Sequence, residues 1–377
     1  MVTFKSILLG FDWNSRRLTV GVVQEFRAEL IEMLTKTWHA GRRGFAVSEL
    51  ERLVGKLGRV GQVYRPIYHI MGQLYASVGY ALCQNGKYLY GSNSQYRQLI
   101  ADIKKVDREE ATSLEGRQMN FALSQASKRR HGCQKTYIMP PSFHEELSFL
   151  RAAICDTTFA LESHLGAMVD REHTWNIAGD SCKSSGGGWS IDLLIWWYHD
   201  YPLEIVRRAR LPNKKSKGYI CINCLETIVV IINLAAAIVA CDSDALDTSY
   251  IPILLNYCDN TSACAWITKR CRAGPIGRAL GCFFMGLLMS TNISIQSVWL
   301  STTDNKLADE ISRFRSTDIA YDFSRLVHDY PQLQGCRRFQ PSDFLLSKMH
   351  SILLGQCSPD PMELRRLKPI DLGVITF

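Results

Sequence analysis

The sequence has little of what marks fibrous, disordered or secreted proteins. Its 377 residues include only 26 glycines and 12 prolines, which excludes collagen-like and low-complexity classes. It shows no internal repeat, so solenoids are also excluded. The opening residues, MVTFKSILLGFDW, hold too short an apolar stretch for a secretory signal. With 46% hydrophobic and 21% charged residues, we expect a globular protein of two or three domains.

The 13 cysteines lack a disulfide or zinc framework. Many lie in apolar runs, which is typical of reduced core residues, so we expect an intracellular protein, cytoplasmic or nuclear. Cys221 and Cys224 form a CxxC pair, but no second CxxC or histidine pair follows at zinc-ribbon spacing. The pair therefore does not predict a metal site.

The charge is distributed unevenly along the chain. Residues 1–150 hold 21 Lys and Arg against 13 Asp and Glu, so they carry the whole net charge of +8 and the rest is balanced. A basic segment beside a neutral one is typical of a module that grips a polyanion, joined to one that needs carboxylates of its own. The alternative is a basic surface that is merely solvated.

One run is about as long as a membrane span. Residues 219–241, YICINCLETIVVIINLAAAIVAC, would register as hydrophobic enough to cross a bilayer. Glu226 interrupts this run, and an ionisable group inside a lipid-facing helix is costly. We predict instead a short strand over 218–223, a buried helix from Cys224, and no membrane partner.

A β-hairpin and several helices are predicted for the first half. Two β-rich runs, 6–13 and 17–23, are separated by a turn. Helices are predicted over 26–38, from Ser48, over 67–82, over 95–131 and from Ser142. On the second of these helices, Arg52, Lys56 and Arg59 form a basic stripe. Such a stripe either follows a phosphate backbone or is an ordinary solvated face.

The pattern changes after residue 170 to that of an α/β domain. Five strands are predicted in order, over 174–180, up to about Tyr198, over 218–223, over 251–258 and over 293–300. Glycines at 186–188 mark a tight hairpin between the first two strands. Helices follow the third, fourth and fifth strands. The predicted fold is therefore a mixed five-stranded sheet flanked by helices, preceded by an α+β region.

Four acids lie beside hydrophobic sequence in this order. Asp180 is on the first strand and Glu226 is near the start of the first helix. Asp259 follows the fourth strand, and Asp309 is in the last helix. Converging carboxylates repel one another and favour a hard, oxygen-liganded ion such as Mg²⁺ between them. Two such ions can activate a water and stabilise the leaving oxygen in phosphodiester cleavage.

Each acid taken alone has an ordinary explanation. Asp259 with Asn260 can cap the next helix, and Asp309 can be a solvated helix acid. Asp180 can begin a turn. It is their order on successive strands and helices that predicts a shared site.

Four blocks of the second half carry a family resemblance: GDSCKSSGGGW, INCLETIVVIIN, NYCDNTSACAWITKRCRAGPIGRAL and VWLSTTDNKLADEISR. They resemble the successive blocks of the RNase H domain in retroelement reverse transcriptases, above all those of the tyrosine-recombinase (DIRS) type. LLGFDWNSRRLTV and ELERLVGKLGRV resemble the primer-grip hairpin and thumb helices of the same polyproteins. The resemblance covers roughly residues 6–82 and 170–314.

The resemblance implies a metal-dependent ribonuclease H that cleaves the RNA of an RNA/DNA hybrid. It implies that Asp180 bridges two Mg²⁺ ions, which Mn²⁺ can replace, and that Asp309 holds the nucleophile-side ion. Glu226 and Asp259 complete the other ion, and Glu226 also lies near the ribose 2′-hydroxyl. The residues assigned to nucleic-acid contacts are Arg52, Lys56, Arg59, Asn260 and Asn305.

Two features depart from the family pattern. The loop before Asp309 reads STTDNKLAD and lacks the histidine that many RNase H domains carry there, so we expect slower turnover or another proton-transfer group. No YxDD-type palm motif occurs, so we expect that this chain alone does not polymerise DNA. We expect it to be part of a longer polyprotein with palm and fingers, a truncated product or a retained remnant.

We therefore predict four parts: a hairpin and thumb-like region (1–92), a helical connection (93–169), an RNase H-like domain (170–316) and a tail (317–377). The predicted function is an RNase H-type endonuclease. The alternative is a catalytically inactive, retroelement-derived nucleic-acid-binding or scaffold protein, because intact ligands are necessary but not sufficient for cleavage. Retention of all four acids favours activity.

Overall fold

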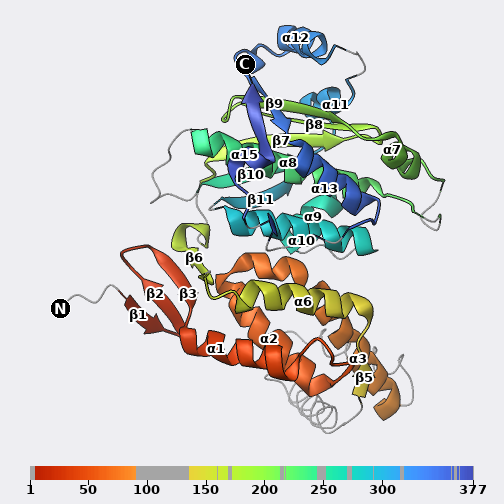
Figure 1. The fold of residues 1–377 in the computed structure, drawn as a ribbon. Helices are drawn as coiled ribbons and strands as arrows, with labels where there is room; N and C mark the ends of the chain where they lie inside the picture. Colours follow the sequence, from red (N-terminus) through yellow and green to blue (C-terminus); the bar gives the residue numbers. More distant parts are fainter. Residues whose placement is uncertain are drawn as a thin grey trace, which may run out of the picture. The chain divides into compact units, whose positions relative to one another are not determined.

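The computed structural model describes most of the chain (Figure 1). The described residues are 5–90, 136–158, 160–168, 172–212, 216, 218–243, 252–269, 274–291, 293–314, 318–357, 359–360, 363–364 and 366–376. They belong to two compact units, one of Met1–Gln24, Val63–Ile70 and Asp156–Phe377, the other of Glu25–Gln62 and Met71–Cys155. These boundaries differ from those of the four predicted parts. The helix predicted over 95–131 lies outside the described residues.

The second unit is mainly helical. Its elements are α1 (Gln24–Glu32), a π-helical turn (Met33–Thr37), β4 (Gly44–Ala46), α2 (Val47–Val63), α3 (Gly72–Tyr90), β5 (Thr136–Ile138) and α6 (Pro141–Cys155). Helix α2 begins one residue before the predicted Ser48, and the Glu49 carboxylate accepts the N–H of Ala46 at 2.9 Å. The helix predicted over 67–82 is instead a 3₁₀ segment, Arg65–Ile70, followed by α3.

Aromatic rings and one buried acid hold the helical unit together. Trp38, Phe45 and Phe143 are fully buried, and the two phenylalanine rings stack with centroids 5.6 Å apart. Glu146 of α6 is also buried, and both its carboxylate oxygens accept the N–H of Gln73 at 2.8 Å. That charge-assisted bond caps the first turn of α3 and so joins it to α6.

The first unit opens with a four-stranded antiparallel sheet in the order β1-β2-β3-β6. Its strands are β1 (Lys5–Leu8), β2 (Phe11–Asn14), β3 (Thr19–Val22) and β6 (Glu162–His164). The first run of the predicted hairpin is split by an extra turn, where Leu9 and Gly10 have φ of 53° and 74°. Arg17 pairs with Glu162 at 2.6 Å.

The main sheet has seven strands in the order β11-β10-β7-β8-β9-β12-β13 (Figure 1). They are β7 (Trp175–Ser181), β8 (Ser185–Ser190), β9 (Ile195–Asp200), β10 (Ile253–Cys258), β11 (Ser294–Trp299), β12 (Arg337–Pro341) and β13 (Gly373–Thr376). Strands β7, β8 and β9 form an antiparallel meander. Strand β10 runs parallel to β7, and β11 runs parallel to β10. The predicted α/β class, with a mixed sheet flanked by helices, is confirmed.

The predicted number of five strands is wrong. Strand β12 pairs in parallel with β9, and β13 pairs antiparallel with β12, so the tail extends the sheet. Their sequences, RRFQP and GVIT, are too short and, for β12, too charged to give a strand pattern.

The predicted second and third strands are also wrong. The second is in fact β8 and β9, separated by a turn over 191–194 in which Leu194 has φ of 50°. Ser190 Oγ accepts the N–H of Leu193 and stabilises this turn, which contains no glycine or proline. Residues 218–221 form no strand, because α8 begins at Ile222 and takes up the end of that run.

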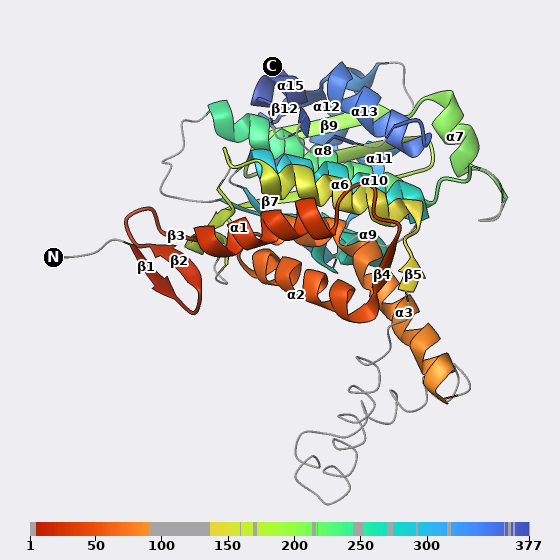
Figure 2. The same ribbon diagram turned by 60° about the horizontal axis from the view of Figure 1, so that its bottom comes forward.

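Helices lie on both faces of the main sheet. They are α7 (Leu203–Ala209), α8 (Ile222–Ser243), α9 (Thr261–Lys269), α10 (Gly274–Ser290), α11 (Lys306–Ser312), α12 (Ile319–Asp329), α13 (Asp343–Leu353) and α15 (Pro369–Leu372). Short 3₁₀ turns at Leu165–Ala167 and Pro331–Leu333 also belong to this unit, as does the 3₁₀ segment Arg65–Ile70. Figures 1 and 2 show α8 on one face of strands β7 to β9, and Figure 1 shows α11 on the other.

Three consecutive glycines on β8 allow both helices to approach the sheet closely. A Cβ atom on Gly187 would lie 2.5 Å from Ile311 Cγ2 and 3.0 Å from the Ser312 nitrogen of α11. One on Gly188 would lie 2.7 Å from Asn233 Oδ1 of α8. Because successive strand residues face opposite sides, side chains on this strand would push both helices away.

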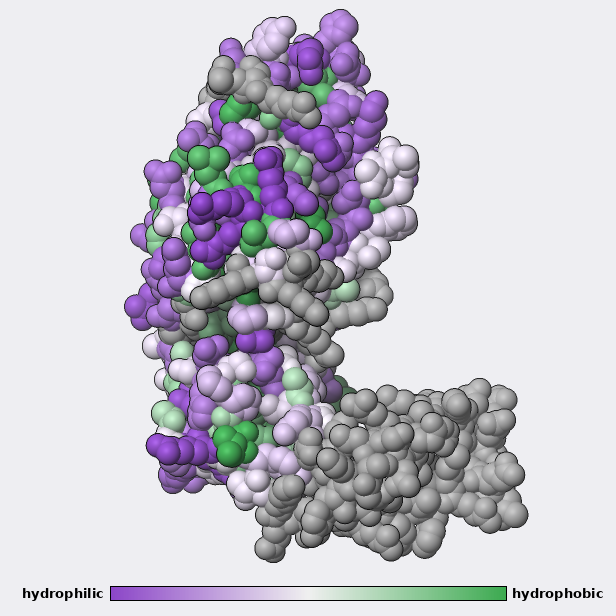
Figure 3. Space-filling view, turned by 90° about the vertical axis from the view of Figure 1, so that its right-hand side faces the viewer, coloured by the Kyte–Doolittle hydropathy of each residue, from purple (hydrophilic) through white to green (hydrophobic). Residues whose placement is uncertain are grey.

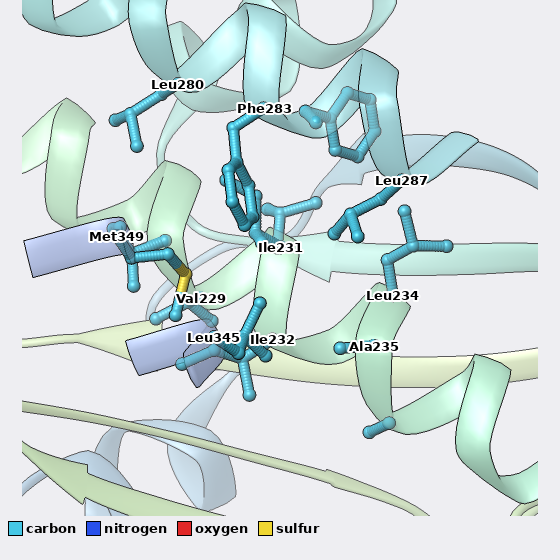
Figure 4. Close-up of a cluster of buried hydrophobic side chains, with 14 of the residues drawn as sticks. Val229, Ile231, Ile232, Leu234, Ala235, Leu280, Phe283, Leu287, Leu345 and Met349 are labelled. Atoms are coloured by element: carbon cyan, nitrogen blue, oxygen red, sulfur yellow. The ribbon is translucent and has the colours of Figure 1, made fainter. Parts of the chain in front are cut away.

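Helix α8 lies at the centre of the core. Figure 4 shows Ile231 of α8 beside Phe283 of α10, with Met349 of α13 in the same cluster, and all three are fully buried. Among the described residues α8 is the one helix long and apolar enough to cross a membrane, and 89% of its apolar window is buried within the protein. Figure 3 shows one face of the molecule, where hydrophobic residues form small patches among hydrophilic ones.

A buried chain of polar side chains fixes α8 to the sheet. Trp197 Nε1 donates to Asn233 Oδ1 at 2.8 Å, and Asn233 Nδ2 donates to Asn256 Oδ1 at 2.8 Å. Asn256 Nδ2 then donates to Ser297 Oγ at 3.2 Å. The chain joins β9, α8, β10 and β11. A satisfied network of this kind favours one register, because a shifted strand would leave buried amides without partners.

The glycine at 187 gives a direct test of the close packing. We expect Gly187→Ala to lower the free energy of unfolding by about 1 to 3 kcal/mol, since its Cβ would meet the backbone of α11. Gly55→Ala in α2 is the matched control, because a Cβ there meets nothing within 4 Å. That change should raise stability by up to about 1 kcal/mol. Urea denaturation followed by circular dichroism measures both, and equal effects would contradict the packing argument.

Candidate metal centre

Two of the four acids lie at the same edge of the main sheet. Strands β7 and β10 are parallel neighbours, and Tyr257 pairs with Ala178. Asp180 and Asp259 each follow that pair by two residues. Parallel strands end at a common edge, so the register brings these two acids, which lie far apart in the sequence, to one place.

Glu226 reaches the same place from the first turns of α8. Its carboxylate, the Asp259 carboxylate and the Cys258 thiol each offer a ligand atom, and the three atoms lie within 4.8 Å of one another. Cys258 Sγ is 3.8 Å from Glu226 Oε2. Glu226 and Cys258 are buried, whereas Asp259 is partly exposed. A hard ion such as Mg²⁺ takes the carboxylate oxygens of this group rather than the sulfur.

Asp309 enters from the other face of the sheet, in the first turn of α11. Arg313, one turn later, donates from both Nε and Nη2 to Asp309 Oδ1 at 2.7 Å. Ser312, between them on the helix, donates from Oγ to Asp180 Oδ2 at 2.7 Å. The end of α11 therefore contacts two of the four acids.

The carboxylates are close enough to change one another's protonation. The pKa of Asp180 is raised from 3.8 to about 6, mainly by burial and also by the charges of Asp259 and Asp309, while the hydrogen bond from Ser312 lowers it. Burial also raises the pKa of Glu226 well above its ordinary value, with Asp180 and Asp259 adding to the effect. Each of the four acids therefore takes part in at least one of these repulsions. An all-oxygen donor set with this excess of negative charge fits divalent cations.

The two asparagines assigned to nucleic-acid contacts are engaged within the protein. Asn260 Oδ1 accepts the N–H of Ser262 at 3.0 Å and caps α9, while its Nδ2 donates to Asn223. Asn305 is 2% exposed, and its Nδ2 donates to the carbonyl of Gly179 at 3.1 Å. Both side chains therefore position the backbone around the acids.

Sequence reasoning missed the residues that hold the acids in place. Thr302 Oγ1 donates to Asp259 Oδ2 at 2.9 Å, and Trp299 Nε1 donates to the Asp259 carbonyl at 3.0 Å. Ser312 and Arg313 follow Asp309 by three and four residues. That spacing, which places them on the same face of a helix, was the available signal.

The predicted basic stripe lies in the helical unit and is partly neutralised there. Lys56 Nζ is 2.6 Å from Glu29 Oε2, and Arg52 Nη2 is 3.6 Å from Glu29 Oε1. The Arg59 guanidinium lies over the Phe26 ring, 4.8 Å from its centroid. Of the three basic side chains, Arg52 is the exposed one.

The CxxC residues stay close as thiols. Cys221 Sγ and Cys224 Sγ are 3.3 Å apart at the start of α8 and form no disulfide. Among the described residues, the group of potential metal ligands is the one at Glu226, Cys258 and Asp259, not the CxxC pair.

Comparison with known proteins adds little to this geometry. No protein-family model matches the chain, and no curated protein matches it. Among solved structures, it resembles a foamy viral protease-reverse transcriptase in complex with an RNA/DNA hybrid, with 10% sequence identity and a TM-score of 0.26. The alignment covers 84% of this chain and 31% of that one, so this chain spans less than a third of that chain's length. Likeness at this level assigns neither a family nor an activity.

The raised pKa of Asp180 predicts how stability depends on pH without Mg²⁺. The folded state keeps this proton up to about pH 6, while the unfolded chain loses it near about pH 4. The free energy of unfolding should therefore fall as pH rises through this window, by about 3 kcal/mol from Asp180 alone. Mg²⁺ should stabilise the protein more above the window than below it. Urea denaturation in EDTA and in Mg²⁺ measures both, with Asp180→Asn as the control that loses the Asp180 contribution.

A different outcome would count against the site. If the difference in unfolding free energy between wild type and Asp180→Asn, measured in EDTA, does not change from about pH 4 to about pH 7, ionisation of Asp180 does not oppose folding.

Proposed function

We propose that this chain is the RNase H-type endonuclease part of a retroelement reverse transcriptase, resembling those of the DIRS type. It cleaves the RNA strand of RNA/DNA hybrids with the help of two divalent cations. The observation that carries the proposal is the closeness of acids from four separate elements: Glu226 and Asp259 offer oxygens within 4.8 Å of each other, and the charges of Asp259 and Asp309 raise the pKa of Asp180. Such a group of carboxylates is costly unless cations share it.

The topology of the sheet supports this proposal. An antiparallel meander, β7 to β9, is joined along β7 by the parallel pair β10 and β11. This mixed antiparallel and parallel sheet is compatible with the fold that the sequence resemblance implies. The acids lie on or directly after β7, α8, β10 and α11, in the chain order that the sequence resemblance implies. Helices α8 and α11 lie on opposite faces of the sheet.

The four carboxylates are the residues that would hold the ions. Bound Mg²⁺ supplies an activated water and stabilises the leaving oxygen in phosphodiester hydrolysis, and Mn²⁺ can replace it. The chain's own residues hold the acids in place: Ser312 and Thr302 donate to Asp180 and Asp259, and Arg313 offsets the charge of Asp309. With no histidine in the 301–305 loop, proton transfer to the leaving group falls to water or another group.

The substrate assignment rests on the sequence resemblance. The hybrid is bound by its phosphates, with the palm and fingers of a reverse transcriptase as a partner. A catalytically inactive scaffold descended from such an element is the competing function, and cleavage distinguishes the two.

A labelled RNA/DNA hybrid with Mg²⁺ is the direct test. We expect the wild type to cut the RNA strand, and Asp180→Asn and Asp259→Asn to lower the rate by at least about two orders of magnitude, since each removes charge that holds an ion. Asp304→Asn is the matched control, because this exposed acid of the same region lies outside the cluster. If a folded wild type with bound Mg²⁺ does not cut the hybrid, the nuclease function is excluded and the scaffold function takes its place.

The basic stripe is proposed to contact the hybrid's phosphates in competition with Glu29. Replacing Arg52, Lys56 and Arg59 with Ala should flatten the slope of log affinity against log salt by about 2 to 3. Glu29→Gln should steepen that slope by up to about 1, because it releases Lys56 from its ion pair. Binding measured by fluorescence anisotropy over a range of salt concentrations distinguishes this from a stripe that is only solvated, for which neither slope changes.

A further inference from the structure

Ser312 occupies a position that its residue type alone would not indicate. It is the last residue of α11 and is fully buried. Its Oγ is 2.7 Å from Asp180 Oδ2 and 2.9 Å from the carbonyl of Asp309. The hydroxyl has one hydrogen, and an ionised carboxylate is the stronger acceptor of the two. With Asp180 ionised, the hydrogen bond to its carboxylate therefore prevails.

A second serine, Ser185, attaches the end of α11 to the sheet. Ser185 of β8 is 2% exposed, and its Oγ donates to the Ser312 carbonyl at 2.7 Å. Cys182 Sγ approaches the same carbonyl at 3.4 Å. The end of α11 is thus attached to the β7–β8 hairpin through the backbone of Ser312. The Ser312 hydroxyl is therefore not needed for this attachment and can donate to Asp180.

The orientation of Asp180 matters because this acid lies among the other three. A carboxylate on a short side chain rotates about its terminal bond over a broad range unless something holds it. A hydrogen bond to Oδ2 fixes the carboxylate plane without adding a positive charge that would compete with a cation. Arg313, by contrast, offsets the charge of Asp309 directly.

We propose that Ser312 is a positioning residue that orients Asp180 for the divalent cations. The proposal rests on the proposed function for its effect on cleavage, but its effect on metal binding can be measured on the free protein. It also explains why α11 must pack directly on Gly187: a wider spacing would take the Ser312 hydroxyl out of reach of Asp180.

The test compares Ser312→Ala with Ser185→Ala. The two serines are equally buried, and their hydrogen bonds at the end of α11 have the same length, but only Ser312 contacts an acid through its side chain. Loss of a group that orients a metal ligand typically lowers metal affinity by about 10- to 100-fold. We expect that loss for Mn²⁺ bound to Ser312→Ala, measured by electron paramagnetic resonance without substrate. Ser185→Ala should bind Mn²⁺ within about threefold of the wild type, because the Ser312 hydroxyl that contacts Asp180 is retained.

Cleavage gives the second readout. The Mn²⁺ concentration for half-maximal cleavage by Ser312→Ala should rise by the same factor, while the KM for the hybrid stays at the wild-type value. Melting curves without metal establish that both variants are folded. Equal Mn²⁺ affinity in Ser312→Ala and wild type would overturn the proposal, as would an equal loss in Ser185→Ala or a wild type that binds no Mn²⁺. A wild type that binds Mn²⁺ but leaves hybrids intact would instead overturn the proposed function.

Discussion

Two helices approach the glycine strand β8 closely, and this packing determines where the acids of the candidate site lie. Strand β8 carries no side chains at 186–188, so α8 and α11 contact the sheet from opposite faces beside β7. Helix α8 brings Glu226 and α11 brings Asp309 to the strand that carries Asp180. The parallel pairing of β10 with β7 then adds Asp259.

This arrangement is unfavourable for the carboxylates themselves. Burial and the neighbouring carboxylates raise the pKa of both Asp180 and Glu226, so the fold opposes ionisation of these two side chains. Proteins keep such groups where a cation relieves the repulsion. The surrounding hydrogen bonds act on individual acids, with Ser312 on Asp180 and Thr302 on Asp259. If the proposed function holds, such a site gives up stability of the metal-free fold for affinity toward divalent ions.

The sequence predicted the elements whose patterns are local and strong. Strands β7, β10 and β11 and helix α11 are where the alternation of apolar residues placed them, and the four acids lie on the expected elements. The turn over 191–194 was missed because a leucine adopts positive φ there without glycine or proline. Strands β12 and β13 owe their place to pairing with a distant partner, which a short segment does not reveal. The hydrogen bond from Ser312 to Asp180 joins residues 132 positions apart, so it follows from the packing of α11 on the sheet and no local sequence pattern predicts it.

We propose that four carboxylates share divalent cations at one edge of the sheet. Anomalous diffraction from crystals grown with Mn²⁺ tests it most directly, because it locates the ions without reference to activity. We expect manganese peaks bounded by the carboxylate oxygens of Asp180, Glu226, Asp259 and Asp309. Ordered manganese elsewhere on the protein, with none among these four side chains, would contradict it.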